Sequence, residues 1–412
     1  MAGGRTLALR AICGMVAGLL ALGGAGGGEA RDLTGSFAYR ERIVLPPQAT
    51  LLVEATDGLG RPLASLRQPT AGAQVPLGFA LAAPEGQDLL LRGGLSIDGE
   101  VRWLSAPVRV AAGADAADLG LIPLAPYRPM GFASRLRCGD LSAEVGFRAD
   151  GAILRVGPRQ IALAPAEAAS GAKYADPADP GTWVWSKGDA VSISLGGTAL
   201  PECAAALPAG DGWRATGHEP DWAITVGGGQ LSYAPLGAET RAIALPVPEP
   251  AGAGALYRLD PIGLSLTVTP DLCRDTMTGM PHPDRVTLAE GTAILTGCGG
   301  DPAALIAGPE WRISELAGAP LPEGAEATLL LSSGGGLAGR AACNRFTGRY
   351  TLSGEGLRLE PGGMTMMACP EPVMAAERAI RDALAKVDRF DFDEAGDLLL
   401  IGGDAVLLRA RF

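Results

Sequence analysis

The chain has little of three residue types on which catalysis and core packing commonly depend. Its 412 residues include only three lysines against thirty-one arginines and two histidines, and only 5% of the residues are aromatic. Two histidines provide few general bases, and the cysteines show no Cys-x-x-Cys spacing that would indicate a metal site. We therefore expect a protein without enzymatic activity, cofactor or metal, whose cores are built mainly from Leu, Val, Ala and Ile.

Basic residues are also outnumbered, and the formal net charge is −11. Such an acidic surface argues against binding to nucleic acid or to an anionic membrane. Opposite net charges accelerate protein association. The charge therefore favours a basic protein as partner.

The N-terminal segment has the pattern of a signal peptide. Two arginines precede an uncharged run from Ala11 to Leu22, and Gly28-Glu29-Ala30 forms a small-x-small cleavage site. The run is shorter than the about 20 apolar residues that span a bilayer, and Cys13 lies too near its start to accept a lipid. We expect cleavage of residues 1–30, no integral membrane segment afterwards, and a periplasmic product that is soluble rather than lipid-anchored.

Six cysteines remain after this cleavage, and they fall into three couples that are well separated along the chain. An exported protein meets an oxidising compartment. Although six cysteines permit 15 pairings, the simplest interpretation is one disulfide per domain, each stabilising its domain by about 3 to 4 kcal/mol. The expected pairs are Cys138–Cys203, Cys273–Cys298 and Cys343–Cys369.

Glycine and proline are abundant, with 60 and 32 residues, which favours many short strands joined by tight turns. The chain is also too long for a single core. Joints rich in Pro, Gly and Ala lie at residues 122–129, 204–210 and 299–309. We expect a mainly β protein of several small antiparallel β-sandwich or barrel domains, the last with one C-terminal helix, over residues 31–126, 130–206, 210–300 and 308–412.

Local patterns predict individual elements within these domains. Thr50–Asp57 alternates apolar with polar residues, as a half-buried strand does, and Asp98-Gly99 is a hairpin turn signal. Further hairpins are expected over 143–156 and 183–193. Residues 372–387 carry apolar side chains at helical spacing, and Glu377 lies four residues before Arg381, the spacing of a stabilising ion pair.

Three segments resemble known families. Gly35–Pro47, together with Val75–Phe79, resembles the YbaY-type lipoproteins related to type III secretion pilotins, which implies a sandwich fold. Gly217–Trp222 looks like an uncharacterised exported domain with a Gly-x-Glu-Pro-x-Trp motif. Gly339–Tyr350 and Met364–Cys369 are similar to the META domain of heat-shock-associated envelope proteins. These resemblances imply an alternative function for the chain, a non-catalytic envelope stress or chaperone-like structural protein.

Two of the three lysines lie in one segment, between Cys138 and Cys203. It contains Ser170-Gly171-Ala172-Lys173-Tyr174 and then Trp183-Val184-Trp185-Ser186-Lys187-Gly188. Over residues 134–205 it resembles the MliC family of periplasmic inhibitors of C-type lysozyme. A lysine where arginine is the usual cation suggests a requirement for a compact ammonium group.

The resemblance to the MliC family implies a site and a partner. C-type lysozyme uses two carboxyl groups that flank the scissile bond. The hydroxyl of Ser170 and the ammonium of Lys187 would satisfy both groups within the cleft, with Lys173 and Tyr174 in the same binding loop. We therefore expect a lysozyme inhibitor; the oligomeric state is not predicted.

One enzymatic alternative needs separate treatment, because Ser170-x-x-Lys173 matches the acylation motif of serine β-lactamases. That motif requires a helix start and the companion motifs Ser-Asp-Asn and Lys-Thr-Gly. Gly171 and strand-like surroundings disfavour the helix, and neither companion occurs in the sequence. The segment is therefore interpreted as a binding loop.

Overall fold

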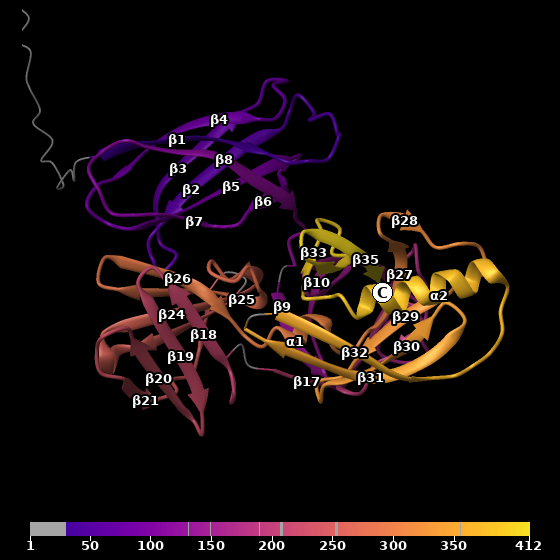
Figure 1. Ribbon diagram of the computed structural model, residues 1–412. Coiled ribbons are helices and arrows are strands. Elements are labelled where there is room, and N and C mark those ends of the chain that lie inside the picture. The colour runs from indigo at the N-terminus through magenta and orange to yellow at the C-terminus, as the bar shows by residue number, and fades with distance from the viewer. Residues whose placement is uncertain are drawn as a thin grey trace, which may run out of the picture.

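The computed structural model describes residues 30–130, 132–148, 150–188, 190–206, 209–251, 254–354 and 356–412. The described chain forms four β-sheets in sequence order, each with its own hydrophobic core. Figure 1 shows the first sheet above the other three. The expected fold class, mainly β with a C-terminal helix, is confirmed. The expected signal peptide lies outside the described residues, apart from Ala30.

The first sheet has the strand order β3-β2-β5-β6-β8-β1-β4, with β7 paired to β5. The predicted strand is confirmed as β2, and Asp98 and Gly99 form the β5–β6 turn with φ of 52° and 83°. β1 and β8 run parallel, whereas the sequence predicts antiparallel sheets. The strands are β1 (Ala30–Ala38), β2 (Thr50–Thr56), β3 (Pro62–Pro69), β4 (Leu77–Pro84), β5 (Leu89–Ile97), β6 (Glu100–Ser105), β7 (Val108–Val110) and β8 (Ala117–Pro126).

The second sheet closes into a barrel. Consecutive strands from β9 to β14 pair as neighbours, β14 pairs with β15, and β17 links β15 back to β9. Alternate residues such as Leu141, Ala143 and Val145 fill the interior. The strands are β9 (Phe132–Cys138), β10 (Leu141–Arg148), β11 (Gly151–Val156), β12 (Arg159–Ala166), β13 (Ala172–Ala175), β14 (Trp183–Lys187), β15 (Ala190–Leu195), β16 (Thr198–Ala199) and β17 (Cys203–Ala205).

The third sheet is antiparallel, in the order β21-β20-β19-β18-β26-β25-β24-β23-β22. Its core contains the fully buried Tyr233 and Tyr257. The elements are β18 (Arg214–His218), β19 (Asp221–Gly227), β20 (Gln230–Pro235), β21 (Arg241–Ala244), β22 (Glu249–Ala251), β23 (Gly254–Leu259), the 3-10 helix η1 (Asp260–Ile262), β24 (Leu264–Arg274), β25 (Pro281–Glu290) and β26 (Ala293–Gly299).

The fourth sheet runs β32-β31-β30-β29-β27-β35-β34-β33, with β28 paired to β27. Leu305 and Ile306 of a short helix join its core, as do Val373 and Ile380 of the C-terminal helix. The elements are α1 (Ala303–Ile306), β27 (Glu310–Leu316), β28 (Ala319–Pro320), β29 (Ala327–Leu331), β30 (Gly336–Ala341), β31 (Asn344–Ser353), β32 (Gly356–Met364), α2 (Glu371–Leu384), β33 (Arg389–Phe392), β34 (Leu398–Gly402) and β35 (Ala405–Arg411).

The predicted C-terminal helix is α2, which ends three residues earlier than the apolar spacing suggests. The expected ion pair between Glu377 and Arg381 is wrong. Glu377 is buried, and its carboxylate accepts hydrogen bonds from the backbone N–H (2.7 Å) and the side-chain amide (3.3 Å) of Asn344. The i,i+4 spacing cannot reveal this, because Asn344 is contributed by a distant strand.

The six cysteines form the disulfides Cys138–Cys203, Cys273–Cys298 and Cys343–Cys369. These are the pairs that the sequence analysis expects. Each bridge connects segments within one of the three later sheets. The first joins the neighbouring strands β9 and β17 of the barrel.

Contacts between the sheets are specific. Asp88 of the first sheet accepts a hydrogen bond from the backbone N–H of Ile294 in the third sheet (2.9 Å), as well as from Arg109 (2.8 Å) and from the N–H of Ala112 (2.6 Å). Burial alone would raise the pKa of Asp88, but these hydrogen bonds hold it below its usual value. The first sheet is therefore attached to the third through a buried, ionised carboxylate.

Candidate functional site

The barrel brings Ser170 and Lys187 to one end. Strands β13 and β14 pair with Ala172 opposite Ser186. Ser170 lies two residues before this pair and Lys187 one residue after it, so the two residues lie at the same end of the sheet. Both are exposed to solvent. We call the segments 167–171 and 186–188 the tip.

Gly171 allows the two halves of the tip to lie against each other. Its φ is +72°, and a Cβ at this position would lie 2.2 Å from the carbonyl oxygen of Ser186 and 3.2 Å from the Cα of Lys187. Both the left-handed backbone and the close approach require glycine. The geometry of the tip thus explains why glycine follows Ser170 in the sequence.

Trp185 connects the same two segments through its side chain. Its Nε1–H donates a hydrogen bond to the carbonyl oxygen of Ser170 over 2.7 Å. The sequence analysis assigns no role to Trp185. One indication is present in the sequence: Trp183 and Trp185 lie two residues apart, so in a strand both side chains lie on the same face of the sheet.

Lys173 and Tyr174, the other two residues of the expected site, contact aromatic side chains of the barrel. The Nζ of Lys173 lies over the ring of Trp183, 4.8 Å from its centroid. Tyr174 is half-buried and packs on the barrel core, with its ring 5.6 Å from that of Phe147. Both side chains therefore have partners within the barrel.

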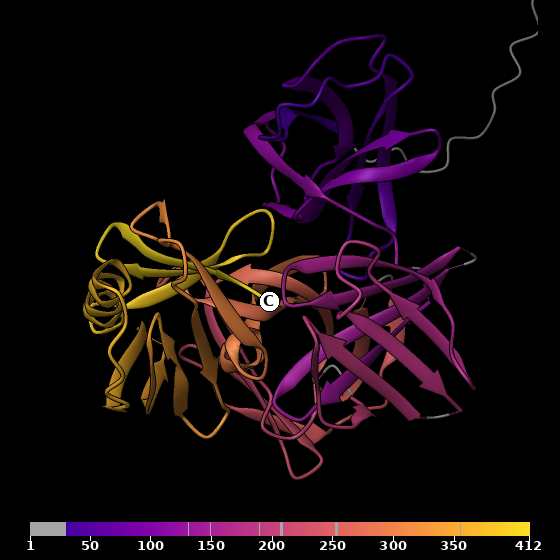
Figure 2. The same ribbon diagram turned by 90° about the vertical axis from the view of Figure 1, so that its right-hand side faces the viewer.

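The other end of the barrel is attached to the fourth sheet. The carboxylate of Asp140 accepts hydrogen bonds from the N–H (3.0 Å) and the hydroxyl (2.5 Å) of Ser333, and Arg312 donates to the carbonyl oxygen of Gly196 (2.9 Å). The guanidinium of Arg159 also lies over the ring of Phe412. Strands of the second sheet extend outward from this attachment in Figure 2. The tip, at the opposite strand ends, therefore points away from the fourth sheet.

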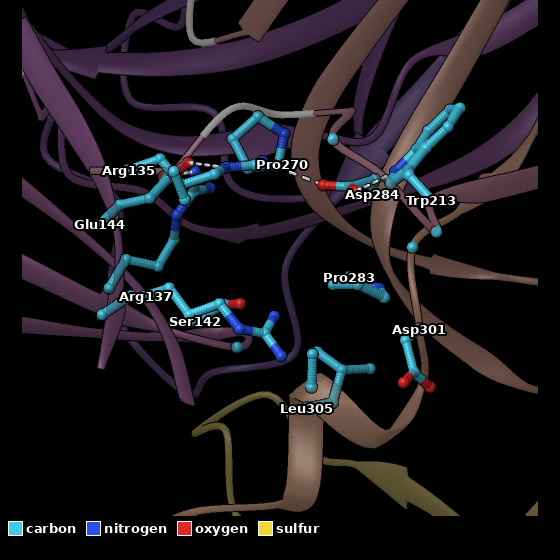
Figure 3. Close-up of a pocket in the computed structure, with 18 of the residues that line it drawn as sticks. Arg135, Arg137, Ser142, Glu144, Trp213, Pro270, Pro283, Asp284, Asp301 and Leu305 are labelled. Atoms are coloured by element: carbon cyan, nitrogen blue, oxygen red, sulfur yellow. Dashed lines mark hydrogen bonds and ion pairs between the residues drawn. The ribbon is translucent and has the colours of Figure 1, made fainter. Parts of the chain in front are cut away.

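The outer wall of the barrel faces the third sheet across a cavity of about 770 Å³. Figure 3 shows Arg135, which donates to Glu144 (3.4 Å) and to Asp284 of β25 (2.9 Å). Asp284 also accepts a hydrogen bond from Trp213 (2.9 Å), and burial raises the pKa of this carboxyl group. Arg155 bonds the second oxygen of Glu144. A buried ionic network thus holds the barrel against the third sheet.

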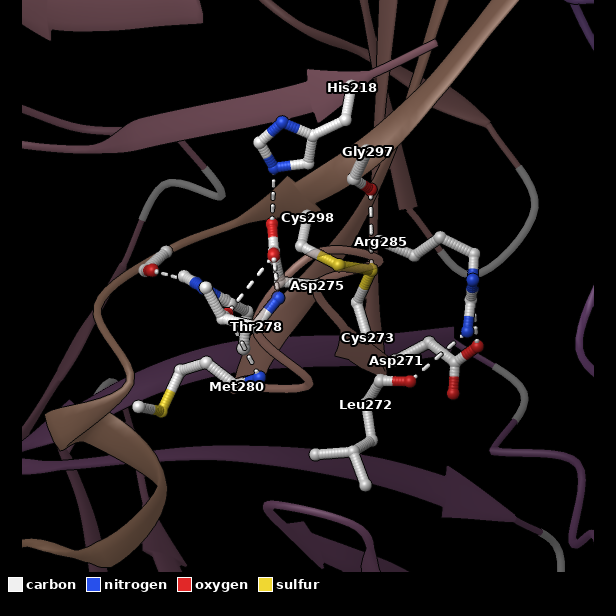
Figure 4. Close-up of a disulfide and its surroundings, with 12 residues drawn as sticks. His218, Asp271, Leu272, Cys273, Asp275, Thr278, Met280, Arg285, Gly297 and Cys298 are labelled. Carbon is white, nitrogen blue, oxygen red and sulfur yellow. Dashed lines mark hydrogen bonds and ion pairs between the residues drawn. A yellow bond between two sulfur atoms is a disulfide. The ribbon is translucent and has the colours of Figure 1, made fainter. Parts of the chain in front are cut away.

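His218 lies between two carboxylates of the third sheet. Its Nε2 lies 2.7 Å from Asp275 and its Nδ1 lies 3.1 Å from Asp221. Figure 4 shows it beside the Cys273–Cys298 disulfide. Burial lowers the pKa of His218, but the two carboxylates outweigh this effect and raise it above its usual value. The imidazole connects β18 to the loop that follows β24.

Comparison with known families supports three of the four resemblances that the sequence suggests. Family models match for the META domain (residues 304–411), for the membrane-bound lysozyme-inhibitor of c-type lysozyme (137–201), and for the type III secretion system lipoprotein chaperone YscW (29–119). The chain is therefore a multidomain protein that contains a lysozyme-inhibitor-family domain, a META domain and a pilotin-like domain. No curated protein matches the chain.

Two solved structures are similar to parts of the chain. One is an alternative pilotin from the type II secretion system of Vibrio cholerae, with 27% identity over 23% of this chain and 96% of that chain, at a TM-score of 0.21. The other is an NMR structure of a protein from Burkholderia xenovorans, with 31% identity over 27% of this chain and 88% of that chain, at a TM-score of 0.22. Among the described residues, no helix is long and apolar enough to cross a membrane.

Proposed function

We propose that this protein is a periplasmic inhibitor of C-type lysozyme that inserts the Ser170 hydroxyl and the Lys187 ammonium into the active-site cleft of the enzyme. One observation carries the proposal. The two side chains are exposed at the same end of a barrel that matches the lysozyme-inhibitor family, on backbone segments that are in direct contact.

The chemistry of the pair suits the cleft. Lysozyme works with one carboxyl group that is protonated and a second that is ionised. The Lys187 ammonium would pair with the ionised carboxylate through a charge-assisted hydrogen bond. The Ser170 hydroxyl would bond the other group, because a hydroxyl can both donate and accept.

Preorganisation of the tip favours tight binding. Gly171 brings the Ser170 segment against Lys187, and Trp185 ties its carbonyl oxygen to β14. A loop that is fixed before binding loses less conformational entropy when it binds. The acidic net charge of −11 would also accelerate the encounter with a basic enzyme.

A second candidate function rests on the first and last sheets. The family model of a secretion lipoprotein chaperone matches residues 29–119, and the META model matches 304–411. In this alternative the four sheets are four domains of a chaperone-like envelope protein, and the barrel is a scaffold without inhibitory activity. The two candidates differ in whether the full chain inhibits lysozyme.

Inhibition constants of the full chain and its variants against a basic C-type lysozyme test the proposal. Lys187→Ala should cost about 2 to 5 kcal/mol, because a desolvated carboxylate of the enzyme is left without a partner. Ser170→Ala should cost about 1 to 3 kcal/mol, the penalty for an unpaired buried polar group. Lys187→Arg should also weaken inhibition, because a planar guanidinium does not replace a point charge.

Lys386→Ala is the matched control. It removes the remaining lysine of the chain, an exposed residue that follows α2 in the fourth sheet. Its inhibition constant should equal that of the parent. If the Lys187 and Ser170 alanine variants also inhibit like the parent, the assignment of the tip is wrong.

A further inference from the structure

The β5–β6 hairpin of the first sheet lies next to the tip end of the barrel. Arg148, the last residue of β10, donates a hydrogen bond to Glu100 at the start of β6 (2.9 Å). Glu100 also pairs with Arg102 (2.8 Å), and Arg148 lies 3.5 Å from Asp150. The hairpin turn is therefore attached directly to the end of β10; in Figure 1 the β6 end of the first sheet lies above β10.

The end of β10 and the tip belong to the same end of the barrel. Strands β10, β12 and β14 alternate with strands that run antiparallel to them, so all three point the same way. Arg148 ends β10, the tip segment 167–171 follows β12, and Lys187 ends β14. The loops of the fourth-sheet attachment lie at the opposite strand ends.

An aromatic contact links two strands at this end of the barrel. Phe147, one residue before Arg148, and Tyr174, three residues after Gly171, lie on separate strands, and their ring centroids are 5.6 Å apart. The strand that carries Arg148 and the strand that follows the Ser170 loop are therefore in contact near this end. The hairpin is joined to the first of these strands by the Arg148–Glu100 hydrogen bond.

A protein bound at the tip would cover more than Ser170 and Lys187. A standard interface buries about 800 Å² on each partner, which corresponds to a disc of about 16 Å in radius. Because the hairpin turn is bonded to the same end of the barrel, a partner that covers this end would also meet the turn. We propose that the β5–β6 hairpin, with Asp98 and Glu100, forms part of the lysozyme-binding surface, so that the enzyme contacts the first and second sheets together.

The charge of this region fits a basic enzyme. Three carboxylates, on Asp98, Glu100 and Asp150, outnumber the two guanidiniums of Arg102 and Arg148, and Asp98 is exposed at the turn. Carboxylates at the rim of an interface act mainly on the association rate, and salt screens their effect. The hairpin would therefore speed and orient the approach of the enzyme to the tip.

The inference rests on the proposed inhibitory function, and the full chain tests both. The variant Asp98→Asn/Glu100→Gln removes two charges, and asparagine tolerates the positive φ of 52° at residue 98. We expect its association rate constant with a basic C-type lysozyme, measured by surface plasmon resonance at low ionic strength, to fall about threefold or more. The difference from the parent should disappear at about 1 M salt, where the Debye length is about 3 Å.

The control variant Asp118→Asn/Glu85→Gln changes the net charge equally at the far end of the first sheet. Asp118 lies near the start of β8, eight residues before Pro126, and Pro126 is the β8 residue that pairs with Trp103 of the hairpin strand β6. Asparagine at position 118 can keep the hydrogen bond from the N–H of Gly120 (3.0 Å). Its association rate should stay near that of the parent. Equal rates for the two double variants would overturn the composite surface.

Hydrogen exchange gives a readout that does not depend on charge. Amides 97–100 should exchange more slowly in the parent complex than in the free chain, and unchanged exchange there would also overturn the inference. Failure of the proposed function and failure of the composite surface can be told apart. If the parent chain does not inhibit lysozyme, the proposed function is wrong; if it inhibits and neither hairpin readout responds, only the composite surface is wrong.

Discussion

The Nε1–H of Trp185 donates to the carbonyl oxygen of Ser170 over 2.7 Å, which ties the loop before β13 to the strand that carries Lys187. Trp185 lies two residues before Lys187 in β14. The same strand therefore positions both members of the pair, one through its backbone and the other through a tryptophan side chain.

We expect Trp185→Phe to weaken inhibition about fivefold to tenfold. The substitution keeps an aromatic ring but removes one hydrogen bond, which contributes about 1 kcal/mol. If Trp185 acts by positioning Ser170, its substitution should cost much less in the Ser170→Ala background. Inhibition constants of the two single variants and the double variant measure this coupling, and full additivity would contradict a positioning role.

Gly171→Ala should disrupt the tip more than Gly188→Ala. Both glycines have positive φ, at 72° and 61°, but a Cβ on Gly171 would lie 2.2 Å from the carbonyl oxygen of Ser186, whereas nothing lies within 4 Å of a Cβ on Gly188. Gly188→Ala carries only the backbone strain, about 1 to 2 kcal/mol. Amide exchange over 172–175 and 183–187 should accelerate more in Gly171→Ala, and equal acceleration would argue against the close approach.

Protonated His218 should stabilise the third sheet at mildly acidic pH. Its folded-state pKa is raised by Asp275 and Asp221, despite the opposing effect of burial. This contribution is fully present below the unfolded value of about 6.5 and is lost as the pH rises through the higher folded value. The melting temperature of His218→Gln should therefore fall further below the parent at pH 5.5 than at pH 8.5. An equal difference at both pH values would contradict the effect.

Asp275 sets the acid limit of the same interaction. Burial raises its pKa, but hydrogen bonds from the N–H of Thr278, from His218 and from the Thr278 hydroxyl lower it below its usual value overall. Its contribution is present above the unfolded value of about 3.9 and is lost as the pH falls through the depressed folded value. The difference between parent and His218→Gln should thus be largest between about pH 4 and pH 6.5.

Asp284→Ala should loosen the barrel from the third sheet without changing inhibition. The variant leaves the Nε1–H of Trp213 without its acceptor and Arg135 without one of its carboxylates, in a buried site. Removing one partner of a buried ion pair costs about 3 to 5 kcal/mol. Solution scattering should show a larger radius of gyration, with an unchanged inhibition constant. An unchanged radius would mean that the network does not hold the sheets together.

The sequence predicts features that depend on local chemistry. Asp98-Gly99 identifies a hairpin because both residues tolerate positive φ, and the apolar spacing of 372–387 identifies α2. The family resemblance groups Ser170 with Lys187, and the strand register brings both to the same end of the barrel.

Features that depend on contacts between distant segments were not predictable. Glu377 bonds Asn344 instead of Arg381, and Arg135 bonds Asp284 across 149 positions of sequence. Trp185 has an ordinary strand environment in sequence, and its donor role depends on how the β12–β13 loop folds back. Neither periodicity nor spacing encodes such pairs, because each depends on how separate elements pack.

A crystal structure of the full chain bound to a C-type lysozyme tests the central claim most directly. The distance to measure joins the Nζ of Lys187 to the ionised catalytic carboxylate of the enzyme. We predict a value of about 3 Å or less, as expected for a charge-assisted hydrogen bond, with the Ser170 hydroxyl bonded to the second carboxyl group. A complex in which the enzyme binds elsewhere and leaves both side chains in solvent would contradict the account.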